Sequence, residues 1–119
     1  MEDDNMPECL FCRIIDGSLP TEFVYEDEHV VAFRDINPAA PVHILVVPRA
    51  HIETVADLGI DTAGVMSRLT AAANRIAREA GVDAGGYRLI VNCGRDGGQT
   101  VFHLHMHLLA GRKMPELAA

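Results

Sequence analysis

The sequence predicts an α+β fold, in which an antiparallel sheet of about five strands carries one long helix. Short runs rich in Val and Ile, such as residues 30–33 and 44–47, are typical of strands, and turn residues separate them. One longer segment, residues 61–80, instead repeats its apolar residues at helical spacing. With 119 residues, the chain suits one domain with a single core.

The N-terminal half is expected to contain a short helix and an antiparallel meander. Residues 10–15 form the helix, which stops at Gly17 and is followed by Pro20. Two prolines and an asparagine mark residues 35–41 as a loop. The strands expected here are residues 21–25, 29–34 and 42–47.

The C-terminal half is expected to add the long helix and two strands. Asp61 suits the N-cap of the helix, and Gly81 suits the position just after its end. The strands are expected at residues 87–93 and 101–109, on either side of a glycine-rich loop at 94–98.

Charge and hydropathy argue against several functions. The formal net charge of −7 disfavours binding to a nucleic acid polymer, which needs clustered Lys and Arg. The apolar runs are too short to span a bilayer, so no membrane association is expected. The chain opens with acidic residues where a signal peptide would be basic, which predicts a cytoplasmic protein. Residues 1–8 are expected to be a flexible acidic tail and residues 113–119 a short C-terminal tail.

Cys9 and Cys12 form a CxxC pair close to the N-terminus. Three cysteines without a secretory signal argue against a disulfide framework. Redox CxxC pairs usually follow a strand, and none is expected here, so half of a metal site is favoured over a redox pair. Cys93 is expected to be a buried small hydrophobe.

Three histidines, His103, His105 and His107, occupy alternate positions of the last expected strand and therefore share one face of it. The opposite face, turned to the core, would consist of Phe102, Leu104, Met106 and Leu108. The outer histidines would lie ~13 Å apart, so one metal ion with bonds of about 2 Å does not easily reach both. Either an end histidine serves a metal while the middle one does chemistry, or the face is merely polar.

The glycine-rich loop directly precedes these histidines. Its glycines allow backbone N–H groups to turn towards an anion, and Gln99 and Thr100 add side-chain donors. The pattern differs from the Walker loop, which contains Lys and leads into a helix. Together with the histidines, the loop predicts a phosphate bound beside an imidazole.

The segment HLHMHLL, residues 103–109, has the alternating pattern of the histidine triad (HIT) superfamily, which the chain resembles. CLFCRIIDGSLPTEFVYEDEHVVAFRDINPAAPVHILVVPRAHI resembles the N-terminal half of that family, and VNCGRDGGQTVFHLHMHLLAGR resembles its Hint branch. The resemblance covers residues 9–112 and implies a homodimer of α+β protomers. It implies hydrolysis of adenosine or guanosine 5′-phosphoramidates and acyl-adenylates, with release of the nucleoside monophosphate.

The resemblance also implies catalytic roles. His105 would attack the α-phosphorus and form a nucleotidyl-imidazole that water cleaves, while the backbone carbonyl of His103 would hold its other ring nitrogen. His107 and His43 would flank the phosphate. Thr100 matches a position, often Ser, whose hydroxyl reaches the leaving nitrogen.

The nucleotide would be held from three sides. The implied phosphate side consists of Asn92, Gly98, Gln99, Thr100, Val101 and His107. Asp35 would accept hydrogen bonds from the ribose hydroxyls. The implied base pocket consists of Phe11, Ile14, Phe33 and Ile36, each of which is equally compatible with a plain core position.

Some bacterial members of the family carry a structural zinc ion, and its ligand positions correspond to Cys9, Cys12, His51 and His103. Two thiolates and two imidazoles form a closed tetrahedral site of the structural kind. The family chemistry needs no metal, so His105 would stay free.

Two other functions stay open. One is hydrolysis of dinucleoside polyphosphates, as in the Fhit branch, which the Gly-Gly-Gln-Thr loop and the short C-terminus disfavour. The other is a zinc-stabilised nucleotide-binding or protein-interaction module, which the presence of His105 disfavours. The chain has no Trp, whereas many Hint proteins end in a Trp-containing tail that reaches the partner's active site. Tail-dependent substrate selection is therefore not expected.

Overall fold

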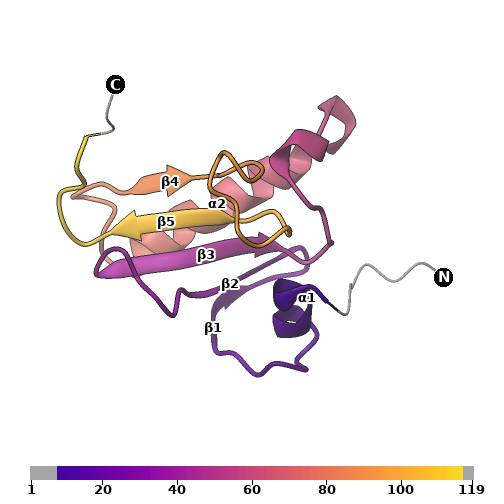
Figure 1. The fold of residues 1–119 in the computed structure, drawn as a ribbon. Helices are drawn as coiled ribbons and strands as arrows, with labels where there is room; N and C mark the ends of the chain where they lie inside the picture. Colours follow the sequence, from indigo (N-terminus) through magenta and orange to yellow (C-terminus); the bar gives the residue numbers. More distant parts are fainter. Residues whose placement is uncertain (1–7, 117–119) are drawn as a thin grey trace.

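A five-stranded antiparallel sheet forms the centre of residues 8–116, the part of the chain that the computed structural model describes (Figure 1). The strands are β1 (Phe23–Glu26), β2 (Val30–Arg34), β3 (Val42–Pro48), β4 (Arg88–Ile90) and β5 (Met106–Ala110). They are arranged in the order β1-β2-β3-β5-β4, so the expected meander of the first three strands is confirmed. The acidic tail expected at residues 1–8 lies, apart from Glu8, outside the described residues, as does the end of the C-terminal tail.

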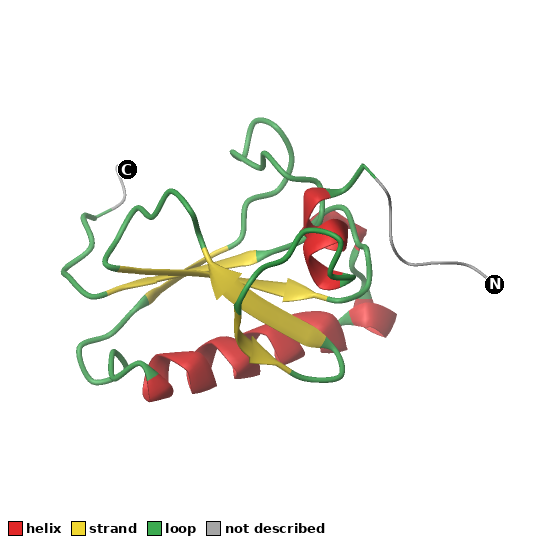
Figure 2. Ribbon diagram, turned by 90° about the horizontal axis from the view of Figure 1, so that it is seen from below, coloured by secondary structure: helices red, strands yellow, loops and turns green. Residues whose placement is uncertain are grey.

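Two helices cover opposite faces of this sheet (Figure 2). α2 (Gly64–Glu79) packs on one face through a buried stripe, and α1 (Leu10–Ile15) lies on the other. The stripe of α2 consists of Leu69, Ala72, Ala73, Ile76 and Ala77. Strands β2 and β3 are therefore buried on both faces, which explains their nearly continuous apolar sequences. The α+β prediction is confirmed. Of the helices in the described residues, none combines the length and apolar character needed to cross a membrane.

The long helix begins later than the sequence suggests. Asp61 lies inside a separate 3₁₀ turn, Ile60–Thr62, and α2 begins at Gly64. The Thr62 hydroxyl accepts a hydrogen bond from the backbone N–H of Gly59, so local side-chain bonding favours the turn over an extended α-helix. The assignment of Asp61 as N-cap was therefore wrong. Gly81 follows the helix with a φ of 74°, as expected for this position.

The strand that carries the histidines is shorter than predicted. Met106 pairs with Val46 on β3, but the next positions of the ladder approach Pro48, which has no N–H to donate. Residues 101–105 therefore leave the sheet, and the backbone N–H of Leu104 donates instead to the carbonyl of Ile52. Leu104, Met106 and Leu108 are buried as expected. Phe102 is 44% exposed, so its placement in the core was wrong.

Candidate active site and metal centre

A cavity of about 450 Å³ opens on the α1 face of the sheet, a size typical of small-ligand sites. α1 contributes apolar side chains, β2 and β3 form the floor, and the segment before β5 forms one wall. The predicted site residues that line the cavity are Phe11, Ile14, Phe33, Asp35, Ile36, Thr100, Val101, His105 and His107. Most of the predicted nucleotide site is thus one continuous space.

His105 stands just before β5 with its proton position defined. Its Nδ1 lies 2.7 Å from the backbone carbonyl of His103, and a carbonyl only accepts, so Nδ1 carries the proton. The other ring nitrogen, Nε2, then keeps its lone pair. Burial lowers the pKa of His105, which favours the neutral ring. Phe11 packs edge-on against it, with ring centroids 5.0 Å apart. His105 is therefore a neutral imidazole suited to nucleophilic attack through Nε2.

A second group of side chains, the relay, lies beside His105 and consists of Asp35, His43 and His107. His43 and His107 are hydrogen-bonded, and Asp35 lies close to His43. The backbone N–H of Ala39 donates to His43 Nδ1 at 3.0 Å, so the His43 proton is on Nε2. That nitrogen lies 2.9 Å from His107 Nδ1 and 3.5 Å from an Asp35 carboxylate oxygen. His107 consequently accepts at Nδ1 and carries its own proton on Nε2. Burial, with the neighbouring His105 and His43, lowers the pKa of His107 to about 4, so it is a neutral donor.

The relay also brings three possible metal-ligand atoms within 4.8 Å of one another. A histidine that binds a metal needs a lone pair on the ligating nitrogen. His43 does not offer one there, because the N–H of Ala39 occupies Nδ1 and keeps the proton on Nε2. The arrangement fits a proton-ordering relay and does not fit a metal site.

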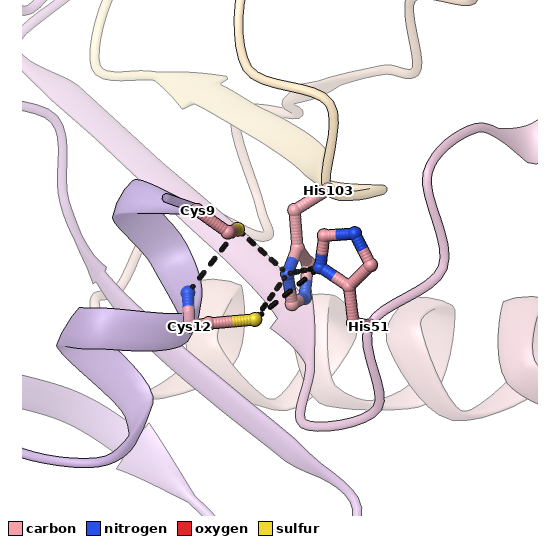
Figure 3. Close-up of side chains that lie close together, drawn as sticks. All are labelled: Cys9, Cys12, His51 and His103. Carbon is pink, nitrogen blue, oxygen red and sulfur yellow. Dashed lines mark hydrogen bonds between the residues drawn. The ribbon is translucent and has the colours of Figure 1, made fainter. Parts of the chain in front are cut away.

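The candidate metal centre consists of Cys9, Cys12, His51 and His103, whose side chains converge between α1, the loop after β3 and the segment before β5 (Figure 3). The two histidine Nδ1 atoms lie 3.2 Å apart. The Cys9 sulfur lies 3.4 Å from His103 Nδ1, and the Cys12 sulfur lies 3.3 Å from His51 Nδ1. A tetrahedral zinc ion with ordinary bond lengths requires separations of about 3.3 Å between nitrogens and about 3.6 Å between nitrogen and sulfur. These three separations are close to those of zinc ligands, and all four atoms lie within 4.8 Å of one another.

His103 also has the proton position that a metal ligand needs. Its Nε2 lies 2.8 Å from the carbonyl of Pro48 and must donate to it, which leaves the Nδ1 lone pair directed to the metal centre. The ring is fully buried, and this burial lowers its pKa to about 4. A neutral, oriented imidazole and two thiols complete a set that fits zinc.

The glycine-rich loop is organised differently from the prediction. The backbone N–H groups of Gly97, Gly98 and Gln99 donate to carbonyls within the loop, so they are not turned towards an anion. The buried Gln99 side chain accepts from Gly94 and donates to the carbonyls of Glu53 and Val101. The hydrogen bonds of the Gln99 side chain, called the loop brace, therefore hold the loop closed. Thr100 and Val101, which follow the loop, line the cavity.

Several predicted residues lie away from the cavity wall. Among the described residues, Asn92, Gly98 and Gln99 do not line it, and His43 reaches it only through His107. Their predicted contacts with the nucleotide stay predictions. Ile36 lines the cavity and is 92% exposed, so it lies at the rim. Cys93 is exposed, and its assignment as a buried hydrophobe was wrong.

Sequence reasoning missed other parts of the wall. Leu45 lies two positions after His43 on β3, so strand alternation places it on the site face and would have identified it. Leu19, Pro20 and Thr21 come from an irregular segment between α1 and β1, for which the sequence holds no comparable periodic signal.

Comparison with known proteins agrees with this geometry. Residues 16–114 match the model of the HIT domain. The chain is 45% identical over 112 residues to the purine nucleoside phosphoramidase of Escherichia coli K12, covering 94% of each protein. It superposes with a TM-score of 0.92 on a HIT family hydrolase from Clostridium thermocellum, at 47% identity over 97% of this chain and 100% of that one. A histidine triad protein from Clostridium difficile gives the same TM-score and identity, over 99% and 100% of the two chains. The chain belongs to the histidine triad family.

Proposed function

We propose that the protein is a nucleotide hydrolase that releases a purine nucleoside monophosphate from phosphoramidates or acyl-nucleotides. The observation that carries this proposal is the state of His105, a buried neutral imidazole whose Nδ1 is tied to the His103 carbonyl. Its remaining lone pair lies in a ring that lines a nucleotide-sized cavity. The phosphoramidase named among its relatives supports the same substrate class.

The proposed reaction has two steps on His105. In the first, Nε2 forms a bond to the α-phosphorus as the bond from phosphorus to the leaving nitrogen or oxygen breaks. The Thr100 hydroxyl, at the cavity wall, is proposed to pass a proton to a leaving nitrogen. In the second step, a water oxygen bonds to phosphorus and the phosphorus–Nε2 bond breaks, which restores the neutral ring. The water gives up one proton in this step, and that proton replaces the one that Thr100 passed to the leaving group.

The rest of the cavity is proposed to bind the nucleoside monophosphate. His107 donates from Nε2 to a phosphate oxygen, and the relay keeps that proton in place. The Asp35 carboxylate already accepts one hydrogen bond, from the backbone N–H of Asn37. Its other lone pairs are proposed to accept from the ribose hydroxyls. The base is proposed to lie among Phe11, Ile14, Phe33 and Ile36, whose apolar surfaces suit a purine.

We further propose that Cys9, Cys12, His51 and His103 hold a structural zinc ion. Bound there, the ion supplies a cross-link between α1, the loop after β3 and the segment before β5. None of the four zinc ligands is proposed to contact the substrate, because the nucleophilic nitrogen belongs to His105.

A homodimer and a domain at residues 9–112 are proposed on the family resemblance, and a cytoplasmic location is proposed alongside them. Sedimentation equilibrium tests the first of these, because a protomer of 12.9 kDa and its dimer differ twofold in mass. A species that stays at the mass of one protomer at micromolar concentration would exclude a stable dimer.

The proposed reaction is tested by release of amine from an adenosine 5′-phosphoramidate. Wild-type protein is expected to turn over, and His105→Ala is expected to lose at least about a thousandfold in kcat, as removal of a nucleophile generally does. The matched control is His29→Ala, which removes an exposed histidine in the turn before β2. Full activity of His105→Ala would exclude the covalent mechanism.

A diadenosine polyphosphate, assayed in parallel, separates the alternative functions. Preferred turnover of that substrate would assign the chain to a polyphosphate hydrolase. AMP binding by an inactive wild-type protein would assign it to a binding module.

A further inference from the structure

α1 takes part in two sites at once. Cys9 and Cys12, three residues apart, place their sulfur atoms in the metal centre. Phe11 and Ile14, also three apart, line the nucleotide cavity. Residues three apart lie on the same side of a helix, so one side of α1 faces each site.

A helix as short as α1 is not stable in isolation, because it has too few turns to offset the cost of nucleation. Its position therefore depends on what its side chains contact. Phe11 and Ile14 pack on Val31, Phe33 and Leu45 of the sheet. Cys9 sits at the N-cap, where its sulfur accepts from the backbone N–H of Cys12, so the Cys9 thiol caps the first turn of the helix.

His103 makes a second link between the sites. Its side chain points into the metal centre while its backbone carbonyl holds Nδ1 of His105. The Phe11 ring then contacts both histidines edge-on, at 5.9 Å from the ring of His103 and 5.0 Å from the ring of His105. A shift of α1 or of the segment that carries His103 must therefore move a wall of the nucleotide cavity.

We propose that metal binding and nucleotide binding are energetically coupled, with Phe11 and His103 as the positioning residues that connect the two sites. The inference rests on the proposed function, because it assumes that the cavity binds a nucleotide and the cluster binds zinc. A metal ion that fixes the thiols fixes Phe11 against His105, and a nucleotide that packs on Phe11 holds α1 in the ligand geometry. Such coupling is reciprocal, so each ligand raises the affinity for the other by the same factor.

The test is a competition titration of zinc against a chromophoric chelator, with and without saturating AMP. The chelator is calibrated with AMP and no protein, which corrects for zinc bound by AMP itself. Wild-type protein is expected to bind zinc at least about fivefold more tightly when AMP is present. Zinc affinity that is the same with and without AMP, while both ligands bind, would overturn the coupling and leave the proposed function intact.

Phe11→Leu tests the connection directly. It keeps all four ligands and most of the apolar volume but removes the ring contacts, so the zinc affinity ratio is expected to fall towards one. The matched control is Ile36→Ala at the rim of the cavity, which weakens AMP binding but keeps the wild-type ratio once AMP saturates.

An unchanged ratio in Phe11→Leu would overturn the proposed connection. A metal-free protein that circular dichroism shows to be unfolded would also overturn the connection. In that case zinc and AMP would be coupled through folding of the whole domain, and the coupling would persist in Phe11→Leu. Absence of AMP binding to wild-type protein would instead overturn the proposed function, and the coupling with it.

Discussion

The candidate metal centre and the relay both gather histidines with acidic or thiol side chains, yet they suit different tasks. Each brings at least three potential ligand atoms within 4.8 Å of one another. In the metal centre, the carbonyl of Pro48 draws the His103 proton to Nε2 and leaves Nδ1 available. In the relay, the N–H of Ala39 occupies His43 Nδ1 and keeps the proton on the nitrogen that faces His107. The backbone group behind each histidine thus decides whether it binds a metal or donates a proton.

Among the variants that separate the two groups, removal of a metal ligand should cause the largest loss of stability. Cys12→Ser is expected to lose stoichiometric zinc and to lower the free energy of unfolding by at least about 3 kcal/mol, since the binding energy of a structural metal is folding energy. Zinc content and urea denaturation measure both effects. Asp35→Asn, in the relay, is the control and should retain the zinc of the wild type. Zinc that disappeared from both variants would show that the two groups are not separate.

Removal of the relay should affect activity and not metal. His43→Ala is expected to lower kcat/KM about tenfold to a hundredfold, because His107 loses the donor that orients its ring. Steady-state kinetics and zinc analysis on the same sample check this. Retention of wild-type kcat/KM would exclude a catalytic contribution from the relay.

Gln99 connects the loop that carries His51 to the cavity wall and should have an intermediate effect. Its side-chain nitrogen donates to Glu53, two residues after His51, and to Val101, which lines the cavity. Gln99→Ala is expected to lower the free energy of unfolding by about 1 kcal/mol, because the partly buried carbonyls of Glu53 and Val101 lose their donor. Thermal denaturation measures this loss, with zinc content expected to stay stoichiometric. An unchanged melting temperature would argue against the brace.

The last effect is a pH dependence of stability to which the relay contributes through His107. The pKa of His107 is about 4 in the folded protein against an ordinary 6.5, so the unfolded chain binds more protons between these values. Its stabilising contribution is complete above pH 6.5 and is lost as the pH falls towards 4. His107→Gln should therefore lose less stability than wild type between pH 7 and pH 4.5, as measured by denaturation at each pH. Parallel losses in the two proteins would contradict this origin, since both share the metal centre.

The elements that repeat regularly could be predicted from the sequence. The alternation of Leu104, Met106 and Leu108 identified the core face, and the spacing of Cys9 and Cys12 at the start of a short helix identified half of the metal centre. Local patterns do not report where a strand loses its neighbour. The position at which β5 begins depends on Pro48, more than fifty residues away in the chain. Residues 101–105 were therefore wrongly placed in the strand, and Phe102 was wrongly placed in the core.

Proton positions and hydrogen-bond partners could not be predicted from the sequence either. The three histidines of the triad look alike in HLHMH, and only the carbonyls and N–H groups that meet them in space give each a separate role. Gln99 reads as a donor for phosphate, whereas its side chain closes the loop. The family resemblance predicted which side chains meet, and the fold determined what each one offers.

Long-range ¹H–¹⁵N NMR of the histidine rings in the zinc-loaded protein at neutral pH tests this division of roles most directly. The expected spectrum has His105 protonated on Nδ1, and His43, His103 and His107 protonated on Nε2, with His103 Nδ1 shifted by the metal. His43 protonated on Nδ1, or His105 protonated on Nε2, would contradict the assignment of the relay and the nucleophile.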